Sequence, residues 1–242
     1  MDRVPGFDSL GIMHQSDWIR TEHIAHYGGV WLDPTIVMFE PVESWLVEGE
    51  LCGFAGLHDV DVIENWAFSA PPGSALMQAW RVEFARAIAM GFDAYKRSGP
   101  VVARMGGTRF HAEQLPYLTH QAALVMAASG SAGALRFAKA SGGHNPLQYL
   151  VDARYNGSLA VHTLLHTRCN PGYRMIKLAR NERNRLTRAL KAGRFVDGGF
   201  VSEALLCERV DSDWMLALTC VLLGVVIVSM GIWGHEWHTA HR

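Results

Sequence analysis

The sequence predicts a mixed α/β fold followed by one long apolar segment. Short apolar runs bounded by Gly, Pro and Asp gather early in the chain, whereas segments with helical spacing of apolar residues dominate later. Residues 214–233 form an apolar run without any charged residue. The chain has 242 residues, of which 49% are hydrophobic and 19% charged, so it can bury a core and is not a disordered chain.

The charge balance and the cysteines exclude several classes of protein. Lys and Arg number 22 against 23 Asp and Glu, so we expect no globally basic nucleic-acid-binding surface and no nucleic-acid partner. The four cysteines form no CxxC pair, which excludes a zinc ribbon and disfavours a disulfide framework. Residues 1–10 carry charges and no apolar run, so no signal peptide is predicted.

The elements are predicted in the following order. A helix is expected over 15–27, where Ser16 or Asp17 can cap the start and Gly28-Gly29 stops it. Extended segments are expected at 30–32, 35–39 and 51–57, with a loop at 71–73. Helices are expected at 74–90 and 113–128, a loop at 97–109, and mainly helical structure up to about residue 193, interrupted by loops at 142–143 and 170–172.

The segment around the first helix carries the residues best suited to chemistry. Asp17 and Arg20 are three residues apart and therefore share a face near the start of the predicted helix. A short strand then delivers Asp33 to its carboxyl end, where ligands bind in open α/β sheets. Arginine suits phosphate or sugar hydroxyls, and a carboxylate suits Mg²⁺ or Mn²⁺. The alternative is a plain helix–turn–strand unit with a surface salt bridge.

This segment resembles a known signature. Ser16-Asp17, Arg20 and residues 27–35 (YGGVWLDPT) are similar to the signature of the capsular polysaccharide synthesis glycosyltransferases. That family belongs to a wider group of sugar transferases with a DXD motif, which includes yeast-type initiating mannosyltransferases and glucosylating clostridial toxins. Weaker similarities lie at 64–70, 72–84, 117–120 and 176–178, so the resemblance extends over about residues 14–190.

The resemblance implies a GT-A-like, Rossmann-like nucleotide-sugar transferase domain over residues 1–195. It implies that Asp17 and Arg20 contact the sugar of the donor, and that Asp33 holds ribose or a divalent metal, Mn²⁺ or Mg²⁺. The metal would stabilise the departing nucleoside diphosphate, and the relatives are mostly retaining enzymes. The candidate catalytic residues are Asp17, Arg20 and Asp33, and the candidate donor-binding residues are Ser16, Asp17, Arg20, Gly28, Gly29, Thr35 and Asn65.

The chain departs from the family pattern in two respects. Thr35 stands where the DXD motif has its second carboxylate, a replacement that is frequent in the capsular branch of the family. Glu40, Asp59 and Asp61 are unranked candidates for a further metal ligand. Only fifteen residues precede Ser16, so the domain is expected to lack the first β-α-β units, which bind the nucleoside base in this family.

The apolar segment 214–233 predicts a transmembrane helix, because its length matches a bilayer and Trp214 and Trp233 bracket it. The alternative is a buried core helix. Residues 196–213 are expected to be a linker and 234–242 a short tail. The basic segment 174–194 is either a membrane-surface helix or a solvated helix, and its charge predicts a single-pass protein with the catalytic part facing the cytosol.

Further residues remain as weaker candidates. His120 is either an active-site residue or part of the core, and Glu64-Asn65, expected after a strand, either contacts a substrate or forms a turn. His162 and His166 share a helix face as a possible metal pair or as solvent-facing residues, Gly106-Gly107 is a weak phosphate-binding candidate, and the histidines from His235 onward are expected at the membrane interface.

The expected function is transfer of a hexose from a nucleotide sugar to a glycan or lipid-linked acceptor, in capsular or surface polysaccharide synthesis. One alternative is a non-catalytic, membrane-tethered remnant that scaffolds a glycan-assembly complex. A weaker alternative is a metal-dependent phosphohydrolase, which would need a second carboxylate near Asp33.

Overall fold

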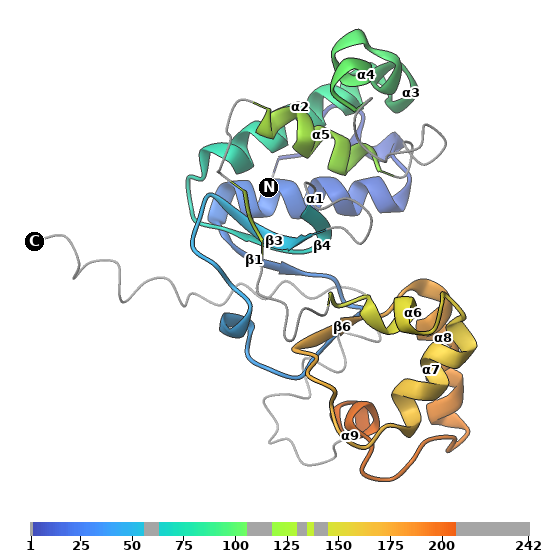
Figure 1. Ribbon diagram of the computed structural model, residues 1–242. Helices are drawn as coiled ribbons and strands as arrows, with labels where there is room; N and C mark the ends of the chain where they lie inside the picture. Colours follow the sequence, from blue (N-terminus) through green and yellow to red (C-terminus); the bar gives the residue numbers. More distant parts are fainter. Residues whose placement is uncertain (1, 56–62, 106–117, 130–134, 138–144, 207–242) are drawn as a thin grey trace, which may run out of the picture. The chain divides into compact units, whose positions relative to one another are not determined.

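The structure is a computed structural model that describes residues 2–55, 63–105, 118–129, 135–137 and 145–206 (Figure 1). These residues form two compact units. Unit 1 holds the described residues of 1–32 and 46–138, and unit 2 holds those of 33–45 and 139–226. The predicted transmembrane segment 214–233 lies outside the described residues. Within the described ranges, no helix has the length and apolar character needed to cross a bilayer.

Unit 1 is built on a four-stranded mixed sheet, which confirms the predicted mixed α/β class. The strand order is β1 (Gly29–Leu32), β4 (Ile63–Ala70), β3 (Leu51–Ala55) and β5 (Leu135–Phe137). Strand β4 runs antiparallel to both of its neighbours. Among the described strands of this sheet, the parallel pairing typical of a Rossmann-like sheet is found only between β3 and β5.

Three helices of unit 1 pack together and gather on one side of this sheet (Figure 1). They are α1 (Ile12–Tyr27), α2 (Ala75–Met90) and α5 (Thr119–Ala128). Their buried side chains, among them Trp18, Ile24, Trp80 and Phe84, form one core with Phe68 of β4. The short elements of the unit are a 3-10 turn at Phe7–Ser9 and the helices α3 (Phe92–Arg97) and α4 (Gly99–Met105).

Helix α1 ends where the sequence predicts, because of a glycine. Gly28 has φ +68°, and its N–H donates to the carbonyl of Ile24 at 2.9 Å. A Cβ at this position would lie 2.4 Å from the backbone nitrogen of Pro72, so the loop at 71–73 leaves no room for a side chain. Gly29 follows with φ +98° and starts β1. This turn directs the chain from α1 into the sheet.

Two predictions about the helices of unit 1 have different outcomes. The helix expected at 74–90 is confirmed, and Ser74 caps it by accepting from the N–H of Met77 at 3.1 Å. The loop expected over 97–109 is wrong for residues 99–105, which form α4. Pro100 lies in the first turn of α4, where proline costs no hydrogen bond.

The described residues of unit 2 form a two-stranded sheet and four helices. Strand β2 (Ile36–Met38) pairs antiparallel with β6 (Met175–Lys177), so that Ile36 faces Lys177. The helices are α6 (Gln148–Asp152), α7 (Gly157–His166), α8 (Arg180–Lys191) and α9 (Phe200–Leu206), with a 3-10 turn at Val42–Ser44. The core of the unit includes Val37, Tyr149, Leu164, Leu165, Ile176 and Leu186. Mainly helical structure was expected here, so β6 corrects that prediction.

The basic segment 174–194 is not one amphipathic helix. The helix α8 begins only at Arg180, because residues 175–177 form β6. Leu186 is 2% exposed, and α8 packs against α7, so the apolar stripe of the helix lies in the core of unit 2. The side chains of Arg183 and Arg188 are exposed. The apolar face that would enter a membrane surface is therefore already buried within the unit.

Candidate functional site

Unit 1 contains a buried polar cluster formed by three elements. Asp17 and Arg20 lie on α1, Asn65 on β4 and His120 on α5. Asp17 is 6% exposed and Arg20 7%, and the Nε of Arg20 lies 3.6 Å from Oδ1 of Asp17. The predicted shared face is thus confirmed, whereas the alternative of a surface salt bridge is wrong. We call these four residues the unit 1 cluster.

The Asp17 carboxylate is contacted from several sides. Nδ2 of Asn65 donates to its Oδ1 at 3.0 Å, and Nδ1 of His14 lies 3.3 Å from its Oδ2. Burial alone would raise the pKa of Asp17. The neighbouring His120, His14 and Arg20 outweigh burial and lower the pKa of Asp17 below its ordinary value. Asp17 is therefore a buried carboxylate that stays ionised.

The guanidinium of Arg20 is held at both ends. Its Nη1 donates to the carbonyl of Asn65 at 2.5 Å, and its Nη2 donates to Oγ of Ser16 at 3.0 Å. The guanidinium carbon also lies 5.3 Å from the ring centre of Trp31 on β1. The predicted cap function of Ser16 is wrong, because α1 begins at Ile12 and Ser16 lies within the helix. Ser16 instead orients Arg20.

His120 is fully buried at the centre of the unit 1 cluster. Its ring stacks on Trp80 with centroids 4.3 Å apart and contacts Phe84 at 4.7 Å. Burial lowers the pKa of His120 to about 3, because the charged imidazolium would lose its hydration there. The imidazole is therefore neutral at physiological pH.

The hydrogen bonds of the unit 1 cluster determine the tautomer of His120. The hydroxyl of Thr21 donates to the carbonyl of Asp17 at 2.7 Å, so its oxygen accepts from Nε2 of His120 at 2.6 Å. Nδ1 of His120 then accepts from Nδ2 of Asn65 at 3.1 Å. The amide nitrogen of Asn65 must face Asp17 and His120. In the flipped amide the oxygen would face the Asp17 carboxylate, and two acceptors cannot form a hydrogen bond. Asn65 thus donates one amide hydrogen to Asp17 and the other to His120.

Glu64-Asn65 comes after the strand β3, as predicted, but Asn65 lies inside β4, so the alternative that these residues form a turn is wrong. The register of β3 against β4 shifts here: Gly53 pairs with Phe68, and Ala55 pairs with Ile63 instead of Trp66. Asn65 falls in this irregular stretch. Such interruptions of a ladder re-aim side chains and are common beside functional sites.

Unit 2 contains a second polar cluster, formed by Asp33, Thr35 and Lys177. Asp33 follows β1 directly in the chain, as predicted. The ammonium of Lys177 lies 2.8 Å from Oδ2 of Asp33 and also contacts the hydroxyl of Thr35. The β2–β6 ladder brings these residues together, and the N–H of Leu178 donates to the carbonyl of Thr35 at 2.9 Å. We call these three residues the unit 2 cluster.

The side chains around Asp33 do not fit a divalent cation. The Lys177 ammonium already binds both Asp33 and Thr35, the residues that align with the metal motif. Two unit positive charges about 4 Å apart repel by about 4 kcal/mol at an effective dielectric constant of about 20, and a dication doubles this. Glu40 pairs with Arg174 at 3.1 Å, Asp59 and Asp61 lie outside the described residues, and the described ranges hold no cluster of three ligating side chains.

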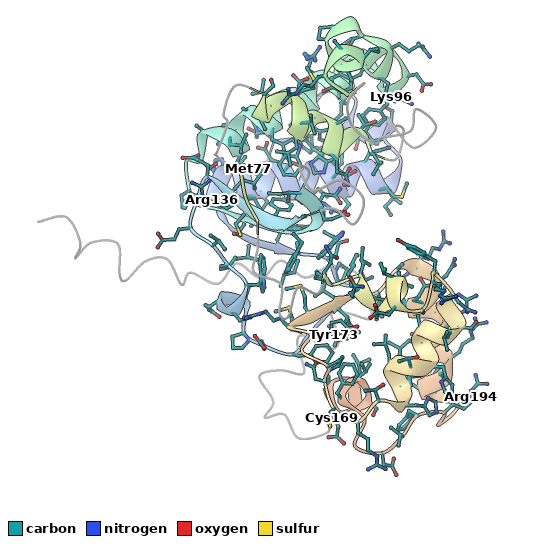
Figure 2. The ribbon with its side chains drawn as sticks, viewed as in Figure 1. Met77, Lys96, Arg136, Cys169, Tyr173 and Arg194 are labelled. Atoms are coloured by element: carbon teal, nitrogen blue, oxygen red, sulfur yellow. The ribbon has the colours of Figure 1, made fainter. Side chains whose placement is uncertain are left out.

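The other candidate residues contribute less to a possible binding site. His162 and His166 share an exposed face of α7 and stack with ring centres 4.0 Å apart, as their spacing predicts. Nδ1 of His166 lies 2.8 Å from the carbonyl of His162, which leaves that ring only its other nitrogen for a ligand. Cys52 is buried, and burial raises the pKa of its thiol, whereas Cys169 is exposed after α7 (Figure 2). Gly106-Gly107 and the tail histidines lie outside the described residues.

Sequence reasoning missed the contacts of two residues, Thr21 beside the unit 1 cluster and Lys177 in the unit 2 cluster. Thr21 carries a sequence signal, since it lies one turn after Asp17 on the same helix face. Lys177 falls in the weakly similar stretch 176–178, but that stretch does not predict its contact with Asp33. The two residues are 144 positions apart and are brought together by the pairing of β2 with β6.

Residues 7–86 match a family model described as capsular polysaccharide synthesis protein. The matched range contains α1, β1, Asp33 and β4, and ends before His120 and Lys177. No curated protein and no solved structure matches the chain. The match supports the resemblance to capsular polysaccharide synthesis proteins on the segment that carries the polar residues of α1 and β4.

Proposed function

We propose that this chain is a glycosyltransferase of capsular or surface polysaccharide synthesis. It transfers a hexose from a nucleotide sugar to a glycan or lipid-linked acceptor. The observation that carries the proposal is the ionised Asp17 beside Arg20, buried in the segment that matches the capsular polysaccharide family model.

Burial of this pair argues for a binding role. Taking two charges out of water costs on the order of several kcal/mol per ion, and an apolar pair would pack as well or better. Two hydrogen bonds offset that cost and also orient the two charges: Asn65 donates to the Asp17 carboxylate, and Arg20 donates to the hydroxyl of Ser16. A carboxylate and a guanidinium held side by side suit the hydroxyl groups of a sugar, one accepting and the other donating.

In the proposed reaction, the bond between the anomeric carbon and the diphosphate oxygen breaks, and its electron pair stays on that oxygen. The oxygen of an acceptor hydroxyl bonds to the same carbon with retention, and its proton passes to the departing diphosphate. Asp17 and Arg20 orient the sugar during this exchange. The family resemblance implies Mn²⁺ or Mg²⁺ at Asp33, but the described residues there do not fit it, so no step is assigned to a metal.

We also propose that the enzyme is anchored in a membrane. A single span at 214–233 with the catalytic part in the cytosol would hold the enzyme close to a lipid-linked acceptor.

A second candidate function is favoured by two features: Thr35 in place of the second carboxylate of the metal motif, and the Lys177–Asp33 pair. In that case the chain is a non-catalytic scaffold of a glycan-assembly complex.

The test is release of nucleoside diphosphate from a panel of UDP- and GDP-hexoses by the full chain in detergent. We expect turnover with one donor, and a loss of about a hundredfold in Arg20→Lys, because lysine cannot reproduce the two-ended hold of the guanidinium. Arg86→Lys is the matched control, since Arg86 also pairs with a carboxylate three residues earlier. Absence of turnover with every donor and acceptor would favour the scaffold.

A further inference from the structure

The ammonium of Lys177 occupies the position in unit 2 where the family resemblance calls for a cation. It contacts the carboxylate of Asp33 at 2.8 Å and the hydroxyl of Thr35. These are the first and last residues of the Asp33-Pro34-Thr35 stretch that aligns with the metal motif. A single ammonium group therefore contacts both of the residues that would hold the metal.

We propose that Lys177 replaces the divalent cation, and that its ammonium binds the diphosphate of the nucleotide. The inference rests on the proposed function, which supplies the nucleoside diphosphate, and it concerns unit 2 by itself. It changes the role of Asp33 from metal ligand to counter-ion of a lysine. Binding of a nucleoside diphosphate then needs no added metal.

The backbone around Lys177 is held firmly enough for this role. Its N–H donates to the carbonyl of Pro146 at 3.0 Å, and its carbonyl accepts from the hydroxyl of Tyr149 at 2.9 Å. The ladder with β2 adds a third restraint. The side chain is thus presented from a fixed strand, which lowers the entropy lost when it binds a phosphate.

The geometry also leaves the pair reachable. The side chain of Lys177 is 14% exposed and that of Asp33 is 19% exposed, so neither is sealed in the core. A phosphate oxygen carries a negative charge, whereas the hydroxyl of Thr35 is neutral, so the positively charged ammonium gains an attraction between opposite charges when phosphate replaces the hydroxyl. Phosphate therefore competes well for the Thr35 contact while Asp33 keeps the ammonium in place.

The experiment measures binding of UDP and GDP to the full chain in detergent by calorimetry, once in EDTA and once with Mn²⁺. We expect the affinity of the wild type to differ by less than about twofold between the two conditions. Lys177→Gln should weaken binding in EDTA by about ten- to a hundredfold, the range of one lost charge-assisted hydrogen bond. Lys177→Arg should retain most of the affinity.

Lys96→Gln is the matched control (Figure 2), because Lys96 also forms a lysine–aspartate pair, at 2.9 Å with Asp93 on α3. It should bind like the wild type. A second readout titrates Mn²⁺ alone by electron paramagnetic resonance, and binding that appears in Lys177→Gln but not in the wild type supports the inference, because the freed Asp33 carboxylate can then hold the metal.

Two results would overturn the inference while the proposed function stands. One is nucleoside diphosphate binding by the wild type only when Mn²⁺ is present, a comparison that needs no variant. The other is unchanged affinity of a folded Lys177→Gln in EDTA. Absence of binding to the wild type in both conditions would instead remove the proposed function, and the inference with it.

Discussion

The side chain of Asn65 on β4 donates one hydrogen to Asp17 on α1 and the other to His120 on α5. Three elements of unit 1 thus meet at a single amide group. Because both hydrogens are committed, Asn65 aligns the Asp17 carboxylate and fixes the tautomer of His120 together. Asn65 is therefore a positioning residue for both Asp17 and His120.

Asn65→Ala removes the link between Asp17 and His120. We expect a drop in kcat of about ten- to a hundredfold with a smaller change in KM, because the carboxylate loses its orientation. We also expect a loss of about 1–3 kcal/mol in the free energy of unfolding, since the partners of the amide remain buried. Kinetics and urea denaturation measure both effects. Asn181→Ala, on the exposed side of α8, should change neither.

The stability of the protein should depend on pH through His120. Its pKa is 6.5 in the unfolded chain and about 3 in the folded one, so the unfolded state binds more protons between these values. Stability from this group is complete above pH 6.5 and falls as the pH is lowered toward 3. Between pH 6.5 and 5 the expected loss is about 2 kcal/mol.

Denaturant unfolding of the wild type and of His120→Gln at these two pH values isolates that contribution. The variant is less stable at pH 7, but its stability should fall less on acidification. Equal slopes in both proteins would mean that His120 is not buried as a neutral imidazole.

Gly28→Ala should destabilise unit 1 for two reasons, the positive φ and the collision with the backbone of Pro72. Gly193→Ala separates them, because Gly193 has φ +64° and open space around its Cβ position. We expect about 1 kcal/mol for Gly193→Ala and about 2–4 kcal/mol for Gly28→Ala. Thermal or urea unfolding measures the difference, and equal losses would contradict the close approach of the loop at 71–73.

Leu186→Ala tests whether the apolar stripe of α8 belongs to the core of unit 2. A buried leucine truncated to alanine costs about 2–5 kcal/mol, so unit 2 should lose stability by that amount. Leu159→Ala on α7 is the control, since Leu159 is 51% exposed, and it should cost under about 0.5 kcal/mol. A Leu186→Ala protein as stable as the wild type would show that this side chain is not part of the core of unit 2.

The features of unit 1 that depend on residues close together in the chain could be predicted from the sequence. The end of α1 at Gly28, the start of α2 at Ser74 and the shared face of Asp17 and Arg20 follow from capping and from helical spacing. The apolar spacing predicts a start at residue 15, whereas α1 begins at Ile12, because the first turn contains exposed apolar residues that blur the periodicity, including Ile12, 83% exposed.

The features that depend on strand register could not be predicted. The shift between Gly53 and Ala55 puts Asn65 within a strand, and the short strand β6 places Lys177 at Asp33. Strands of three residues leave too few positions for a periodic pattern, and pairing across more than a hundred residues leaves no trace in local spacing. The burial of His120 was one of two open alternatives, and the structure places it in the core and in contact with the site at once.

In the proposed function, the buried Asp17 orients the donor sugar for transfer. The most direct test of this role compares nucleoside diphosphate release by the wild type, Asp17→Asn and Glu83→Gln, with folding checked by circular dichroism. Asparagine keeps the shape of Asp17 and removes its charge, and Glu83 is the matched carboxylate of another pair with an arginine three residues later. We expect a fall of about a hundredfold or more in kcat for Asp17→Asn and wild-type activity for Glu83→Gln. A folded Asp17→Asn protein that turns over its donor at the wild-type rate would contradict this role.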